Sequence, residues 1–132
     1  MKRILIFMFA AVLFAACHED LADRAAREAK EFTEKNCPTP VENFTRTDSV
    51  VFDKATTTYH YYCTLTDNMD DSALIATHKD EIIEGLTNGL RQSTDIKIYK
   101  EAGFNFAYTC HSQKNPQQVL LDAVFTKKDY GK

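Results

Sequence analysis

Two segments of the chain alternate apolar and polar residues with a period of two, which is the pattern of a half-buried β-strand. The first is residues 57–66, TTYHYYCTLT, and the second is residues 104–110, FNFAYTC. Each segment places aromatic residues and one cysteine on the same face. The opposite face of the first segment carries Thr58, His60, Tyr62 and Thr64. We therefore predict that both segments are strands of one sheet with a buried face and a less buried face.

Three further segments are predicted to be strands. Residues 45–52 are joined to the first segment by the short connection 53–56, which predicts an antiparallel hairpin. Residues 95–100 are predicted to be a strand that turns at 101–103 into the second segment. Residues 119–126 are predicted to be the last strand, although a short helix satisfies the same apolar pattern.

Two segments have apolar residues at helical spacing. Residues 20–36 carry a narrow, alanine-rich stripe, which Asp20 can cap and which Pro38 prevents from continuing. A second helix is predicted to run to about Arg91, with fraying near its end at Asn88 and Gly89. Its candidate caps are Asp70, Asp71 and Ser72, and its predicted buried stripe is Leu74, Ile75, His78, Ile82, Leu86 and Leu90.

The predicted order of elements is α-β-β-α-β-β-β. Hairpin connections are too short for the crossovers that parallel strands need, so the pattern argues against a parallel sheet. We expect an α+β fold, namely a twisted antiparallel sheet with helices packed on one face, similar to the small sheets of cystatin-like proteins.

The beginning of the chain has the pattern of an export signal. Lys2 and Arg3 precede the unbroken apolar run of residues 4–16. As a helix this run would span only about 20 Å, which is short of the ~30 Å hydrocarbon core of a bilayer. We therefore predict a signal peptide at residues 1–16, followed by one α+β domain at residues 17–132, of which residues 17–20 form a short tether.

The residues Phe14-Ala15-Ala16-Cys17 resemble the bacterial lipobox, in which small residues precede a cysteine that becomes acylated. Phe14 departs from the leucine usual in that motif. The resemblance implies a lipid anchor on Cys17, and two or three acyl chains would hold the protein stably at a membrane. An ordinary signal peptide followed by a chance cysteine is the alternative. The expected location is the cell envelope, on the periplasmic or the surface face of the outer membrane.

The charge of the mature chain excludes some classes of partner. Removal of residues 1–16 takes away Lys2 and Arg3, so the 16 basic residues become 14 against 19 acidic ones, a formal charge of −5. Nucleic acids and anionic lipid headgroups both require a basic surface. We therefore expect no nucleic-acid partner, and membrane attachment only through the anchor.

Three cysteines follow the anchor, and an oxidising compartment allows one disulfide among them. Cys63 and Cys110 lie on the aromatic faces of two strands that we expect to be neighbours, so they are the preferred pair. The alternative is that both are buried free thiols. Cys37 follows a helix C-terminus, where the helix dipole disfavours a thiolate, so it is a poor nucleophile candidate.

The sequence offers no metal or cofactor site. The four histidines have no ligand spacing, and strand alternation puts His60 on the face opposite Cys63 and His111 on the face opposite Cys110. The acidic cluster at Asp67, Asp70 and Asp71 lacks the glycine and terminal glutamate of a calcium loop, which favours helix capping. We therefore expect no cofactor and no metal.

Several short motifs resemble a group of small exported bacterial proteins of unknown function. They are Asn36-Cys37-Pro38, Val41, Thr45-Arg46, Asp48-Ser49-Val50, Tyr59-x-Tyr61, Leu65 and, weakly, Asp129-Tyr130. Glu19 and Asp20 after Cys17 also resemble the surface-export signal of Bacteroidetes lipoproteins. The triplets at Ser49 and Ser72 resemble the O-glycosylation acceptors of that phylum, which implies candidate glycans on these two serines. The resemblance supplies no activity.

No nucleophile elbow, phosphate loop or catalytic triad is visible, so we expect a protein that is not an enzyme. The first hypothesis is a lipid-anchored binding module that contacts an unknown protein or glycan through the row Thr58, His60, Tyr62 and Thr64, extended by Asn105 and Thr109. Helices covering this row would make it only a packing layer. The alternative is a thiol-based redox or small-ligand protein, and a purely structural envelope role is not separable from the first hypothesis by sequence.

Overall fold

Four strands form one layer of the protein, in the order β1-β2-β3-β4. The structure is a computed structural model that describes residues 19–131. The strands are β1 (Thr45–Asp53), β2 (Thr58–Leu65), β3 (Asn105–Ser112) and β4 (Val119–Phe125). β1 pairs with β2 and β3 pairs with β4 in antiparallel fashion, whereas the central strands β2 and β3 are parallel.

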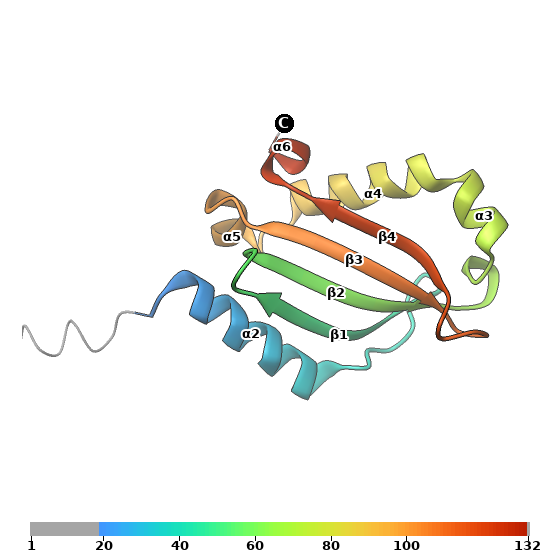
Figure 1. Cartoon of the computed structure of the whole chain (residues 1–132), viewed down its shortest axis with the longest axis horizontal. Helices are drawn as coiled ribbons and strands as arrows, with labels where there is room; N and C mark the ends of the chain where they lie inside the picture. The colour runs from blue at the N-terminus through green and yellow to red at the C-terminus, as the bar shows by residue number, and fades with distance from the viewer. Residues whose placement is uncertain (1–18, 132) are drawn as a thin grey trace, which may run out of the picture.

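Helices form the second layer. They are α2 (Leu21–Asn36), the 3-10 turn η1 (Asp67–Met69), α3 (Ser72–Thr77), α4 (Lys79–Gln92), α5 (Lys97–Glu101) and α6 (Lys127–Tyr130). Figure 1 shows α2 running alongside β1 and α4 running alongside β4, with the central strands between them. None of the helices within residues 19–131 is long and apolar enough to cross a bilayer.

The strand register aligns the apolar side chains into rows that cross the sheet. Successive residues of a strand point to opposite faces, so residues that are paired across neighbouring strands share a face. One row consists of Phe52, Tyr59, Phe106 and Phe125, the next of Val50, Tyr61, Tyr108 and Ala123, and the third of Thr47, Cys63, Cys110 and Leu121. The helices cover this face, and the prediction of an α+β fold with helices on one face is confirmed.

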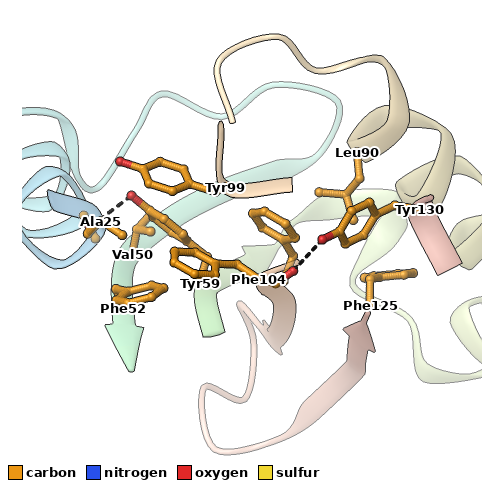
Figure 2. Close-up of a cluster of buried hydrophobic side chains, with 11 residues drawn as sticks. Ala25, Val50, Phe52, Tyr59, Leu90, Tyr99, Phe104, Phe125 and Tyr130 are labelled. Carbon is orange, nitrogen blue, oxygen red and sulfur yellow. Dashed lines mark hydrogen bonds between the residues drawn. The ribbon is translucent and has the colours of Figure 1, made fainter. Parts of the chain in front are cut away.

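The first row forms the centre of the larger core cluster, which Figure 2 shows. Phe106 is fully buried, and Tyr59 packs against Phe52 with ring centroids 5.2 Å apart. The Tyr59 hydroxyl donates a hydrogen bond of 3.0 Å to the carbonyl oxygen of Ala25 on α2, and the Tyr130 hydroxyl donates one of 2.8 Å to that of Phe104. The aromatic row therefore anchors both α2 and α6 to the sheet.

The parallel pairing of β2 and β3 corrects the expectation of a purely antiparallel sheet. The prediction assumed hairpin connections, but residues 66–104 form one long connection that crosses over the sheet through α3, α4 and α5. A crossover of this length is what a parallel pair requires. The sheet is therefore mixed.

The strand predicted at residues 95–100 is wrong, because this segment ends in α5. Ile96 and Tyr99 are three residues apart, so they lie on the same side of a helical turn, and Tyr99 is buried in the core. The segment is the end of the crossover and supplies no strand. The sheet consequently has one strand fewer than predicted.

The second predicted helix is interrupted at His78, where α3 ends and α4 begins. The change of direction removes His78 from the buried stripe, and its ring is exposed beside Glu81. Asp71 is the cap of α3 and its side chain accepts hydrogen bonds from the amides of Ala73 and Leu74, as predicted. α4 remains helical through Gly89 to Gln92, so the predicted fraying is not observed.

Candidate functional site

A groove opens over the middle of the sheet, between α2 and α4. It has a volume of about 490 Å³, within the range of ligand-binding clefts. Its floor consists of Val50, Tyr59, Tyr61 and Tyr108, its α2 wall of Glu28, Ala29 and Phe32, and its α4 wall of Gly85, Leu86, Gly89 and Leu90. We call this hollow the central groove.

The central groove exists because the second row of the sheet is less completely covered than the other two. Tyr61 and Tyr108 of this row stack on one another with ring centroids 4.9 Å apart, and both are half-buried. Burial raises the pKa of Tyr61 to about 12 and also raises the pKa of Tyr108. Among residues 19–131 neither hydroxyl has a hydrogen-bond partner, so both are available to an occupant of the groove.

The α2 wall combines one apolar and one charged contact. Phe32 is 41% exposed, which is unusual for a phenylalanine on the inner side of an amphipathic helix. Glu28 accepts a hydrogen bond of 2.6 Å from the Tyr99 hydroxyl and one of 2.8 Å from Arg24. Partial burial raises the pKa of Glu28, but these two bonds outweigh burial and hold the pKa below its usual value. The rim of the groove therefore carries an ionised carboxylate that is paired with the Arg24 guanidinium.

The α4 wall carries two glycines four residues apart. A Cβ atom built at Gly85 or at Gly89 would meet nothing within 4 Å, so the space in front of both positions is open. Glycine in the middle of a helix costs about 0.5–1 kcal/mol relative to alanine. No contact within the described part of the chain explains why this cost is retained.

The predicted binding row lies on the face of the sheet opposite the central groove. Thr58, His60 and Tyr62 are half-buried, whereas Thr64 is buried. The His60 ring stacks on Tyr62 with centroids 4.2 Å apart, and His60 Nε2 shares a hydrogen bond of 2.7 Å with the Thr109 hydroxyl. We call this surface the open face.

Polar side chains connect across the open face. The Thr109 hydroxyl donates to Asp122, the Thr64 hydroxyl donates to Asp48, and Arg46 forms an ion pair of 2.7 Å with Asp48. Val51 and Val124 are exposed by 51% and 61%. The side chains are thus brought together, but on a flat surface and not in a cleft.

The structure places the other predicted residues as follows. Cys63 and Cys110 are register partners, and both are buried free thiols in this structure. Ser49 is half-buried in β1, and Ser72 is exposed at the start of α3. The signal peptide, Cys17 and His18 lie outside the described residues. The disulfide, the glycans and the lipid anchor stay predictions.

Asp70 does not cap α3 but bonds to the end of β3. Its carboxylate accepts hydrogen bonds from the Ser112 hydroxyl and from the backbone amide of Lys114. These contacts lower the pKa of Asp70 and tie the crossover to the end of β3. Within residues 19–131 no group of three His, Cys, Asp or Glu side chains is placed to hold a metal ion.

Sequence reasoning missed the central groove. Gly85 and Gly89 share one side of α4, and two glycines at this spacing in an otherwise amphipathic helix are a signal that could have been used. Tyr99 was assigned to a strand, so its place at the end of the groove was not foreseen. The exposure of Phe32 has no signal in the sequence, because it depends on the gap between α2 and α4.

The fold and the groove together define a small α+β domain with a mixed four-stranded sheet and an aromatic-floored cleft between two helices. Sequence comparison places it more narrowly. The chain belongs to the family of domains of unknown function designated DUF8479, whose model matches residues 20–121. Comparison with curated proteins gives no significant match.

Three solved structures have similar folds at low sequence identity. A Pseudomonas aeruginosa protein described as secreted, PA3611, superposes with a TM-score of 0.65 at 9% identity over 86% of this chain and 99% of its own. The pilotin EpsS of the Vibrio vulnificus type 2 secretion system gives 0.60 at 8% identity, covering 81% and 88%. The type II secretion pilotin AspS of Vibrio cholerae gives 0.57 at 11% identity, covering 80% and 87%.

Two tyrosine substitutions should separate the groove floor from the core. Tyr61→Phe removes a hydroxyl that has no partner among the described residues, so the free energy of unfolding should change by less than about 0.5 kcal/mol. Tyr59→Phe removes the bond to the Ala25 carbonyl and should cost about 1 kcal/mol. Urea denaturation of both variants measures the difference, and equal losses would show that the Tyr61 hydroxyl is bound within the protein.

Proposed function

We propose that the protein is a lipid-anchored, non-enzymatic binding module of the cell envelope that holds an apolar helical segment of a protein partner in the central groove. The observation that carries this proposal is the pair of glycines on the α4 wall, Gly85 and Gly89, which face open space. Three features of the groove support it.

The first feature is the width that the glycines provide. Helices pack with axes about 8–10 Å apart, and the distance is set by the side chains at the contact. Without side chains at Gly85 and Gly89, a second helix can approach the backbone of α4 closely. Glycine at these two positions makes α4 less stable than alanine would. Such a loss of stability is expected at a position where function requires it, here where the open space serves binding.

The second feature is the length of the hollow. Phe32 lines the central groove and also a second hollow of about 500 Å³, which is bordered by residues of the loop between α2 and β1. An elongated occupant can contact both hollows, which favours a peptide segment over a compact small molecule.

The third feature is the chemistry of the lining. Stacked tyrosines with free hydroxyls at the floor and a carboxylate at the rim provide apolar contact area with a few fixed polar groups. Such a lining is typical of sites that bind amphipathic segments.

The structural neighbours support an envelope role. Two of them are pilotins, which are components of type 2 secretion systems, and a third is described as secreted. By analogy we propose that this chain also serves an exported or envelope-spanning assembly. The likeness concerns the fold, so the partner is inferred from the groove.

The open face is the second candidate surface for a partner. No helix within residues 19–131 covers it, and the stacked His60 and Tyr62 together with Val51 and Val124 present mixed polar and apolar contact area. The alternative of a thiol-based activity is less well supported. The interaction between the two strand cysteines lowers the pKa of Cys63 and raises that of Cys110, but both thiols are buried, and partial burial raises the pKa of Cys37.

Substitution of both groove glycines should have opposite effects on stability and on binding. Gly85→Ala and Gly89→Ala should each raise the free energy of unfolding by about 0.5–1 kcal/mol, because the added methyl group meets no atom of the chain. The same methyl groups occupy the space of the partner, so binding should weaken about five- to 150-fold, as overpacking of about 1–3 kcal/mol implies. Urea denaturation measures the first effect.

Photo-crosslinking in isolated native envelopes measures the second effect. A photoreactive phenylalanine derivative in place of Phe32 should give one defined protein adduct, mapped by mass spectrometry to a segment with helical periodicity. The same residue at Lys79, which is exposed outside the groove, is the control for position, and Glu84→Ala is the control for substitution in α4. The same derivative in place of Tyr62 probes the open face, and an adduct formed only there would move the site to that face. An adduct from position 32 that the glycine variants leave unchanged would contradict the role of the α4 wall.

The lipid anchor is tested by Cys17→Ser. The substitution removes the thiol that would be acylated, so incorporation of labelled palmitate should be lost and the protein should leave the membrane fraction. A Cys37→Ser variant is the matched control and should stay in that fraction. Unchanged labelling and fractionation of Cys17→Ser would contradict the anchor.

A further inference from the structure

We infer that Cys63 and Cys110 form a disulfide when the protein folds in an oxidising compartment, and that this bond ties β2 to β3 beneath α4. The inference does not depend on the occupant of the central groove. It rests on the register of the two central strands and on the surroundings of the two sulfur atoms.

The register places the two cysteines directly beside each other. Cys63 and Cys110 are Cα partners in the parallel pair β2·β3, and both side chains lie on the face that the helices cover. Neighbouring strands lie about 4.7–4.9 Å apart, inside the range of about 4.4–6.8 Å that Cα atoms joined by a disulfide span. The two side chains are close enough that each shifts the pKa of the other.

The third cysteine of the described chain is not a register partner of Cys63 or Cys110. Cys37 follows the end of α2 and is half-buried, and the register partner of Cys63 on the β1 side is Thr47. The register therefore favours one pairing of the three that the composition allows.

The pair is sealed from solvent in the folded protein. Cys63 and Cys110 are each 5% exposed, and Ile82, Ile83 and Leu86 of α4 pack against their cluster. The bond must consequently form before α4 settles on the sheet, while the thiols are still accessible. It would close the loop that contains α3, α4 and α5, and so fix the wall of the central groove to the sheet.

The chemistry needs an external oxidant. One of the two cysteines, as thiolate, attacks a disulfide-bearing oxidant and forms a mixed disulfide with release of one thiol. The other thiolate then displaces the second half of the oxidant. Two protons and two electrons leave the protein, and the oxidant is reduced to two thiols.

The test is refolding of the full chain, in detergent, in a buffer of oxidised and reduced glutathione. Unreacted thiols are then alkylated under denaturing conditions, and the digest is mapped by mass spectrometry. The expected result is a peptide pair linked through Cys63 and Cys110, with Cys37 alkylated. In the variants Cys63→Ser and Cys110→Ser the remaining member of the pair should be alkylated, and Cys37→Ser should leave the linked pair intact.

Thermal unfolding gives a second measure. Closing a loop of this length should raise Tm by at least about 10 °C, so dithiothreitol should lower the Tm of the refolded chain by that amount. The double variant Cys63→Ala/Cys110→Ala controls for effects of the reductant and should show no such shift. Alkylation of both cysteines in the refolded wild-type chain, or a link to Cys37, would overturn the inference.

Discussion

The parallel pairing of β2 and β3 is the constraint on which the rest of this structure depends. Because the two strands run in the same direction, the chain must return across the sheet between them, and it does so through α3, α4 and α5. The register then aligns Tyr59 with Phe106, Tyr61 with Tyr108 and Cys63 with Cys110 on the face that the returning helices cover. A shift by one residue would exchange this aromatic face for the polar one.

The same constraint explains why the covered face is sealed at its ends and open in its middle. α2 is held beside β1 by the Tyr59 hydroxyl, and Thr33 satisfies both backbone groups of Val50 at the edge of the sheet. The returning helix α4 is displaced toward β4. The stacked pair Tyr61 and Tyr108 is left between them, with glycines and not large side chains on the facing wall. The groove is thus a consequence of topology and of two helix positions that lack side chains.

The sequence predicts most of the local structure and little of the site. Strand alternation identifies the core residues Tyr59, Phe106 and Cys63 correctly, because the buried face of a strand depends only on its period of two. The sequence predicts a strand at residues 95–100, where the structure has α5, because Ile96 and Ile98 alternate with polar residues over so short a stretch. The central groove depends on the spacing between α2 and α4 on the sheet. These helices are separated in the sequence by β1 and β2, and no local pattern encodes their spacing. The polar row at His60 and Tyr62 lies outside the core, as its alternation predicts, but the central groove lies on the other face of the sheet.

Hydrogen exchange of the protein in native envelopes tests the central claim most directly. If a helical segment occupies the groove, backbone amides of residues 83–90 in α4 should exchange at least about tenfold more slowly in the envelope than in the purified protein, since binding suppresses the local opening of α4. The amides of α3, which does not line the groove, should be unchanged. Equal exchange of α4 in both samples, with protection gained only in β4, would contradict the groove and place the partner on the opposite side of the sheet.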